Sequence, residues 1–376
     1  SLLELEDEEL LKALGFSREQ GGAQYPTAAG ILMLGKASAI QRFVPTAKSS
    51  FQVLEGTNVR VNEDYSLPIL AAIEKIIAHL EVWNPQRELE FGLFRMSVPG
   101  FATRALREAI VNAFCHRDYS IMGRVRVAVE AAGLTVANPG GVSEGITLEN
   151  LLTAEPHGRN PLLADALKRV GLAEKTGRGI DRIFEGSLIY GRALPDYSKT
   201  TSSTVSLFIP RSKPDVALAR MISDAQNRLG RPLPINMLLV LNVLKALPRG
   251  NAGQIAQAAG LSETVVVTVL NRAIESGLVD PYGTGRGRTY MLSHKLYQDR
   301  EKTIGYVLQR DIDEARYNEL IVNMAKNTDF IARADVMNLL HVSESKAYSL
   351  LKHLVRLNIL APVNKGRYAK YRLKGV

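Results

Sequence analysis

The C-terminal part of the chain carries the same pattern twice, 81 residues apart and without a gap. A repeat of this kind is the signature of one structural unit used twice, because each copy must form the same elements in the same order. We therefore predict two copies of one small module, over residues 213–293 and 294–376. The matching pairs are Ser262/Ser343, Glu263/Glu344, Leu270/Leu351, Pro281/Pro362, Gly285/Gly366, Arg286/Arg367, Tyr290/Tyr371 and Leu292/Leu373.

Copy one is predicted to contain three helices. An apolar helix spans 236–247, and a short helix spans 252–259, where Gly260 suits a helix end. Ser262 is a preferred N-cap residue and begins a third helix, which Gly277 can end in a left-handed conformation. The side chains expected to face the core from this capped helix are those of Val265, Val266, Val269, Leu270 and Ala273.

A hairpin with a basic tip follows the capped helix in each copy. In copy one, strands over 278–279 and 289–292 flank the tip, and in copy two the helix from Ser343 to Leu357 leads to a tip at 364–367. This order of elements resembles a winged helix-turn-helix. In that family the capped helix enters the DNA major groove, and the hairpin, or wing, contacts the backbone or the minor groove.

The resemblance implies a set of DNA-contacting side chains. Arg and Lys neutralise phosphates, whereas Asn, Ser and Arg also read base edges. Copy two is the more basic candidate, with eight bases against one acid over 341–376. Winged helices also serve as protein-interaction or dimer modules, and that alternative stays open for both copies. The expected DNA-binding residues are Thr268, Asn271, Arg272, Arg286, Arg288, Ser345, Lys346, Ser349, Lys352, Arg356, Lys365 and Arg367.

The charge of the chain is divided unevenly. Lys and Arg total 47 and Asp and Glu 38, a net charge of +9. Residues 1–210 hold 22 bases and 24 acids, or −2, so residues 211–376 hold 25 bases and 14 acids, or +11. A positive excess confined to one region indicates a polyanionic partner, most often nucleic acid. A solvated basic surface is the alternative.

The middle of the chain contains a helix with a row of polar side chains. Over 104–120, Glu108, Asn112 and His116 recur at four-residue spacing beside an apolar stripe. A carboxylate can activate water and an amide oxygen can bind Mg²⁺, a combination that suits phosphate chemistry. The same spacing also fits an ordinary solvated helix face.

Two glycine-rich turns follow this helix. Strands over 124–130 and 134–137 lead to Asn138-Pro-Gly-Gly141, and Gly177 and Gly179 directly precede an apolar-periodic helix. Glycines at a helix start let backbone N–H groups approach a phosphate, and the helix dipole favours the anion. The order of polar helix, strands, Gly-Gly turn and Gly-x-Gly helix therefore favours a nucleotide site.

These motifs resemble the divergent gyrase, histidine-kinase and MutL (GHKL) type of ATPase domain in bacterial ATP-binding, RecG-like transcriptional regulators with a C-terminal winged helix. The resemblance covers about residues 25–210, with 26–35 as an expected entry strand. Many members also carry an N-terminal AlbA-like domain. No such domain is visible in this sequence, which suggests a short member or a fragment.

The resemblance assigns a role to each motif residue and implies ATP and Mg²⁺ as cofactors. Glu108 matches the water-activating carboxylate, the general base, and Asn112 the Mg²⁺ ligand. Asn138 stands where the superfamily keeps an aspartate for the adenine amino group, a change that weakens adenine selectivity in principle. The second glycine box is short, so slow or absent hydrolysis is expected. The cofactor-binding residues are Asn112, His116, Asn138, Gly140, Gly141, Gly177 and Gly179.

Other features exclude several alternatives. Cys115 is the only cysteine, which rules out internal disulfides. It stands beside His116, but adjacent helix residues point about 100° apart, so the two do not suit a nucleophile pair and Cys115 is expected to pack in a core. No apolar run reaches the roughly 20 residues of a membrane span, and the acidic start is unlike a signal peptide. We therefore expect a cytoplasmic protein without a membrane partner.

The fold predicted as a whole is α+β. An α/β lead-in over 1–100, with helices over 4–14 and 68–80 and strands near 30–34 and 50–55, packs on a GHKL-like α/β sandwich over 101–212. Two winged helix domains follow, the second preceded by a helical connector that starts at residue 294. The function expected is a homodimeric, DNA-binding transcriptional regulator that senses a nucleotide. The alternatives are a DNA-dependent ATPase in repair or defence and a scaffold with a degenerate nucleotide site.

Overall fold

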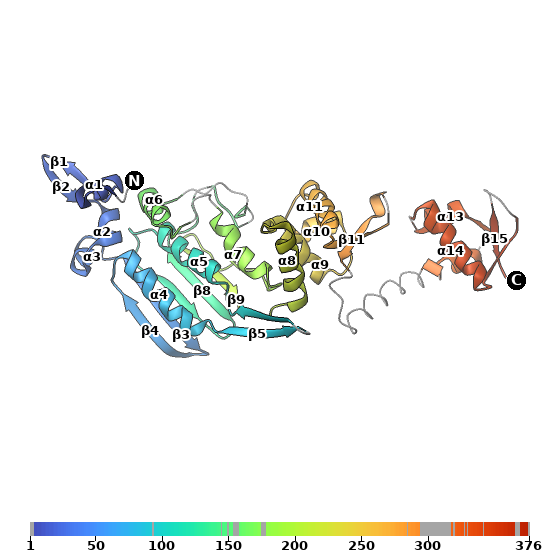
Figure 1. The fold of residues 1–376 in the computed structure, drawn as a ribbon, viewed down its shortest axis with the longest axis horizontal. Coiled ribbons are helices and arrows are strands. Elements are labelled where there is room, and N and C mark those ends of the chain that lie inside the picture. The colour runs from blue at the N-terminus through green and yellow to red at the C-terminus, as the bar shows by residue number, and fades with distance from the viewer. Residues whose placement is uncertain are drawn as a thin grey trace. The chain divides into compact units, whose positions relative to one another are not determined.

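The chain forms two compact units, Ser1–Ala219 and Arg220–Val376, which are described separately. Their elements are labelled in Figure 1. The computed structural model describes residues 4–91, 94–143, 145–148, 150–152, 158–173, 178–283, 285–293, 317–318, 320–326, 328, 330–340, 342–364 and 369–374.

The first unit begins with a small helical region. Its elements are α1 (Asp7–Ala13), β1 (Ser17–Gln20), β2 (Ala23–Pro26), α2 (Ala28–Leu34) and α3 (Ala37–Phe43).

The strand predicted near 30–34 is wrong, because these residues belong to α2. Thr27 caps this helix by accepting a hydrogen bond from the Gly30 N–H at 3.1 Å. Short apolar runs do not distinguish a strand from a helix by periodicity, and Ala, Leu and Met favour the helix. The entry strand expected over 26–35 is therefore a helix as well.

A five-stranded mixed sheet with the order β4-β3-β7-β8-β9 organises the first unit. Its strands are β3 (Lys48–Glu55), β4 (Asn58–Tyr65), β7 (Arg124–Val129), β8 (Gly133–Pro139) and β9 (Thr204–Pro210). Only β3 and β7 run parallel among these neighbours, and the other pairs are antiparallel. The strands predicted over 50–55, 124–130 and 134–137 are therefore confirmed, with shifted ends.

Helices cover one face of this sheet and form the main core with it (Figure 1). Along β7, Val125, Val127 and Val129 are buried in this core, as alternation along a strand requires. The remaining elements of the unit are α4 (Ile69–Trp83), the hairpin β5 (Gln86–Phe91) and β6 (Phe94–Pro99), α5 (Thr103–His116), α6 (Pro161–Arg169) and α7 (Gly179–Leu188). A helix, α8 (Val216–Leu229), spans the boundary between the two units.

Copy one of the repeat forms a helical cluster closed by a three-stranded sheet of order β10-β12-β11. Its helices are α9 (Ile235–Ala246), α10 (Ala252–Ala259) and α11 (Glu263–Glu275). Its strands are β10 (Gly250–Asn251), β11 (Val279–Tyr282) and β12 (Thr289–Leu292), with a short 3₁₀ helix at Gly285–Gly287.

Copy two has the same sheet order, here β13-β15-β14. The register is also the same, because Pro281 pairs with Tyr290 in copy one and Pro362 pairs with Tyr371 in copy two. The elements of copy two are β13 (Ile331–Ala332), α13 (Arg333–Leu340), α14 (Glu344–Arg356), β14 (Leu360–Pro362) and β15 (Lys370–Leu373).

The predicted helix signals are confirmed in both copies. Ser262 accepts a hydrogen bond from the Val265 N–H at 3.4 Å, and Ser343 accepts one from the Lys346 N–H at 3.3 Å. Gly260 and Gly277 have φ values of 65° and 66°, in the left-handed region that glycine adopts readily.

The prediction that Val265 of α11 faces the core is wrong. Val265 is 36% exposed, whereas Val266 is fully buried. Val265 lies about 100° from Val266 around the helix and falls outside the face that α11 buries through Val266, Val269, Leu270 and Ala273.

Positions 294–316 of the predicted helical connector lie outside the described residues. Further along the chain, Ile321 and Ala325 are buried in the core of copy two. Within the described part of the chain, no helix is both long and apolar enough to cross a membrane.

Candidate functional site

A cavity of about 220 Å³ lies in the first unit beside α5. Helix α5 is buried along most of its length and packs on β8 and α7, and its exposed polar residues are Thr103, Arg104 and Arg107 near its start. Other polar side chains of α5 open into the cavity instead. The polar residues on the cavity wall are Glu108, Asn112, His116, Asn138, Ser143, Lys168, Asp181 and Tyr197.

Glu108 lies on the cavity wall and is only 4% exposed. Burial raises the pKa of its carboxyl group, and the nearby Arg182, a hydrogen bond with Asn112 and Arg104 offset part of that rise. The first residue of α7, Gly179, touches this carboxylate. A Cβ at position 179 would overlap Glu108 Oε1 and lie 3.3 Å from Asn112 Nδ2, so only glycine allows this close approach.

His116, at the end of α5, and Lys168, on α6, also line the cavity. Burial lowers the pKa of His116, and the positive charge of Arg159 lowers it further. Cys115 is buried and burial raises its pKa to about 12, which leaves it a neutral packing residue at physiological pH, as predicted. The cavity wall thus combines the buried Glu108 carboxyl group with the His116 imidazole and the Lys168 ammonium.

The Gly-Gly turn after β8 forms another part of the wall. Asn138 is 4% exposed, lines the cavity and donates a hydrogen bond from Nδ2 to the Pro139 carbonyl at 3.2 Å. Gly141 also lines the cavity. Gly140 has a φ of 98°, and a Cβ there would lie 2.8 Å from Asp118 Cβ, so its role in the structure is a tight turn against the segment after α5.

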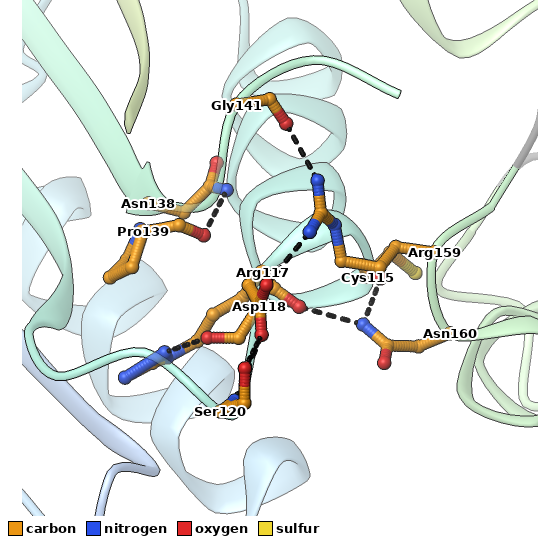
Figure 2. Close-up of polar contacts among 9 residues, drawn as sticks. All are labelled: Cys115, Arg117, Asp118, Ser120, Asn138, Pro139, Gly141, Arg159 and Asn160. Atoms are coloured by element: carbon orange, nitrogen blue, oxygen red, sulfur yellow. Dashed lines mark hydrogen bonds and ion pairs between the residues drawn. The ribbon is translucent and has the colours of Figure 1, made fainter. Parts of the chain in front are cut away.

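Figure 2 shows how three distant segments are joined at this turn. The Asp118 carboxylate forms an ion pair with Arg159 at 2.9 Å, and Arg159 also donates to the Gly141 carbonyl at 3.0 Å. The Asp118 N–H donates to the Pro139 carbonyl at 2.9 Å. The end of α5, the Gly-Gly turn and the segment before α6 are therefore held together beside the cavity.

Two further side chains fix the end of α5. Asn160 donates to the carbonyl groups of Cys115 and Arg117, both at 2.8 Å, and so satisfies acceptors that a helix end leaves open (Figure 2). The fully buried Arg117 donates to the carbonyl groups of Thr46, Asp118 and Gly123.

The structure brings most of the predicted cofactor residues together. One cavity is lined by Glu108, Asn112, His116, Asn138, Gly141 and Gly179. Gly140 lies in the same turn but packs on Asp118, and Gly177 lies outside the described residues. Sequence reasoning missed Asp118, Arg159, Asn160, Lys168 and Tyr197. The signal available for Asp118, Arg159 and Asn160 was polar residues directly flanking two helices, at 117–118 and 159–160, and no local pattern marked Lys168 or Tyr197.

The described residues contain no group of three or more His, Cys, Asp or Glu side chains that could hold a metal ion. Mg²⁺ is commonly bound by one or two protein oxygens together with substrate phosphates and water. The hydrogen-bonded pair of Glu108 and Asn112 fits that mode, in which phosphate oxygens complete the coordination.

The predicted DNA-binding residues lie mostly on exposed helix faces. On α11, Thr268, Asn271 and Arg272 are exposed; on α14, Ser345, Ser349, Lys352 and Arg356 are exposed and Lys346 is half-buried. Arg288 is half-buried. Lys365, Arg367 and the side chain of Arg286 lie outside the described residues.

Residues 123–208 match the family described as "Putative ATP-dependent DNA helicase recG C-terminal". The expectation of a GHKL-like, ATPase-type domain is thus confirmed for residues 123–208. Residues 1–50 match the family "Domain of unknown function (DUF8451)". No curated protein matches the chain.

A solved structure shows the same fold over much of the chain. The crystal structure of the DIP2311 protein from Corynebacterium diphtheriae superposes with a TM-score of 0.64 at 22% sequence identity. The match covers 80% of this chain and 60% of that protein, so the chain spans well under two thirds of its length. At this identity the likeness concerns the fold.

Proposed function

We propose that this protein is a DNA-binding regulator whose first unit senses a nucleotide, with ATP and Mg²⁺ as the ligands. The observation that carries the proposal is the cavity beside α5. Six of the motif residues singled out in the sequence line it, and it lies within and beside the ATPase-type region over 123–208. Small-molecule sites are typically concave and mainly apolar with a few convergent polar groups, which describes this cavity.

In this proposal the chain supplies the ligand with three kinds of contact. The amide of Asn138 faces the base, and the start of α7 at Gly179 presents backbone N–H groups to a phosphate. Glu108 and Asn112 hold Mg²⁺, which supplies charge neutralisation at the phosphates when it is bound. Lys168 adds positive charge to the cavity wall, and the lowered pKa of His116 leaves a neutral imidazole there as a hydrogen-bonding group.

The two copies of the repeat are proposed to be winged helix-turn-helix domains that bind double-stranded DNA. Each has a serine-capped helix with an exposed polar face and a hairpin paired with a third short strand, in the same register. The net charge of +11 over 211–376 favours a polyanionic partner. We expect a homodimer, because a two-fold axis matches paired DNA half-sites.

Regulation requires that the nucleotide has different affinities for two arrangements of the protein. DNA affinity measured with and without ATP gives that coupling directly, and ATP affinity must change by the same factor when DNA is present. Equal DNA affinity in both conditions would contradict the sensor role.

The first experiment is a thermal shift of the purified chain with ATP, ADP and GTP, with and without Mg²⁺. A ligand that binds the folded state raises its melting temperature. We expect ATP with Mg²⁺ to raise it in the wild type and Asn112→Ala to reduce the Mg²⁺-dependent part. Absence of any shift would favour a scaffold whose nucleotide site is degenerate.

A second candidate function is a DNA-dependent ATPase, favoured by one observation. Burial raises the pKa of Glu108, and a general base is most effective when its pKa lies near the working pH. Under this function the chain turns over ATP with Mg²⁺ and DNA, and Glu108→Ala abolishes turnover without preventing nucleotide binding. Phosphate release at the buffer rate in the presence of DNA would remove this candidate.

A further inference from the structure

The two copies of the repeat differ in charge at matched positions of their capped helices. The offset of 81 residues places Lys346, Lys352 and Arg356 of α14 at the positions of Val265, Asn271 and Glu275 of α11. Over the whole helices, α14 has one acid against three bases, and α11 has two acids against one base. The faces of the two modules therefore differ by three charges, from +2 to −1, although their strands share one register.

A second difference lies beside that face, at the contact between α13 and α14. Tyr348 is 42% exposed and packs against two cations. The Arg333 guanidinium lies 5.1 Å from the centre of its ring, and the Lys352 ammonium lies 5.4 Å from it. Tyr348 therefore holds a cation of α13 and a cation of α14 beside one another.

Copy one lacks all three members of this group. The offset places Ala252, Val267 and Asn271 at the positions of Arg333, Tyr348 and Lys352. Packing alone does not require the charged and aromatic residues at these three positions, because copy one forms the same sheet order with small and uncharged residues there.

Among the described residues, Glu344 is the carboxylate that pairs with this group. It forms an ion pair with Arg333 at 2.6 Å while its own side chain is 64% exposed. The equivalent residue, Glu263, is retained in copy one, where alanine replaces the arginine. An exposed carboxylate on a flexible side chain is easily displaced by a phosphate, because surface ion pairs contribute little stability.

We propose that Arg333, Tyr348 and Lys352 form a phosphate-binding site for double-stranded DNA that only copy two possesses. The inference rests on the proposed DNA-binding function and assigns the contacts with backbone phosphates to copy two. Arg333 and Lys352 contact backbone phosphates, Tyr348 positions both cations, and Glu344 is the competitor that the phosphate displaces. The face of α11, with its net charge of −1, does not supply phosphate contacts.

The test measures binding of the full chain to a labelled, random-sequence DNA duplex over a series of salt concentrations. Random sequence suffices because phosphate contacts are independent of sequence, and each lost contact lowers the slope of log affinity against log salt by about 1. Arg333→Ala and Lys352→Ala should each show that decrease and weaken binding about three- to tenfold.

Two further variants separate this role from a structural one. Tyr348→Leu keeps the charges, so the salt slope should persist while affinity falls about two- to fivefold. Glu344→Gln removes the competitor and should strengthen binding about two- to fivefold, although it breaks an ion pair. The matched controls in copy one are Val267→Leu and Glu263→Gln, and these should leave the slope unchanged.

The outcomes distinguish the two levels of the proposal. If the wild type fails to bind duplex DNA even at low salt, the proposed function fails and this inference fails with it. If the wild type binds but Arg333→Ala retains the full slope, or Glu344→Gln weakens binding in a chain that melts like the wild type, the phosphate site alone is wrong. An equal loss of slope in Arg272→Ala, which removes the base of α11, would overturn the restriction of the phosphate contacts to copy two.

Discussion

The contact between Gly179 and Glu108 gives the sharpest test of the candidate site. At an unconstrained position near a helix start, replacing Gly by Ala stabilises a protein by about 0.5 to 1 kcal/mol, since the unfolded chain loses freedom. Here the added Cβ would overlap the buried Glu108 carboxylate and lie 3.3 Å from Asn112 Nδ2. Overpacking of this kind costs about 1 to 3 kcal/mol. We therefore expect Gly179→Ala to destabilise the first unit by about 0.5 to 2 kcal/mol.

The sole tryptophan makes this measurement specific to the first unit. Trp83 is the last residue of α4, so its fluorescence during urea unfolding reports on that unit alone. Gly158→Ala is the matched control, because it also lines the cavity but its Cβ would meet only Ala164 Cβ, at an ordinary 3.8 Å. Because nothing blocks this Cβ, the control should be unchanged or stabilised by up to about 1 kcal/mol.

A double-mutant cycle identifies the clashing group. Glu108→Ala removes the carboxylate that the new Cβ would meet, so in the double variant Gly179→Ala should cost about 1 to 2 kcal/mol less than it does alone. Strict additivity of the two substitutions would refute the contact. The contact would also be refuted if Gly179→Ala stabilised the unit as much as replacing an unconstrained glycine by alanine does.

Three further predictions concern charge and capping. Burial raises the pKa of the Glu108 carboxyl group above its usual 4.5, so the folded state binds the carboxyl proton more tightly than the unfolded chain does. The stability that results is complete below pH 4.5 and is lost as pH rises through the raised pKa. Glu108→Gln should remove this loss, and superimposable stability–pH profiles of the two proteins would contradict it. Arg159→Gln should raise the pKa of His116 in an NMR titration, since the arginine lowers it; an unchanged midpoint would show that burial alone sets the value. Ser262→Ala and Ser343→Ala should each cost about 1 kcal/mol by circular dichroism of the helices, and an unaltered melting curve would deny the caps a role in stability.

The elements that the sequence predicts well are those with a strong local signal. Ser262, Gly260 and Gly277 fix the ends of helices through contacts within a few residues, and the α10 and β12 ranges were predicted to the residue. The helix α2 was missed because Ala28–Leu34 is short and apolar on all sides. Its identity depends on the Thr27 cap and on Gly30 packing against the Phe16 backbone, which only the fold brings together.

The residues of the candidate site likewise include some that a local pattern predicts and some that it does not. Glu108, Asn112 and His116 share one helix, so their spacing alone places them together. The ion pair of Asp118 with Arg159 joins residues 41 positions apart, and no local pattern marks it. The burial that raises the pKa of Glu108 likewise comes from α7 and the sheet, which sequence periodicity does not reveal.

The proposed nucleotide site combines α5 with the matched region over 123–208. The matched ATPase-type region, 123–208, supplies the Gly-Gly turn, α6 and α7, but it begins after α5 has ended. The carboxylate and the amide that would hold Mg²⁺ both come from α5, outside that region. The structure places Glu108 against Gly179 and Asn112 on the same cavity wall as Asn138. Acid, amide and glycine turn are therefore combined by tertiary packing, and a substitution that separates α5 from α7 should abolish ligand binding while each glycine turn stays intact.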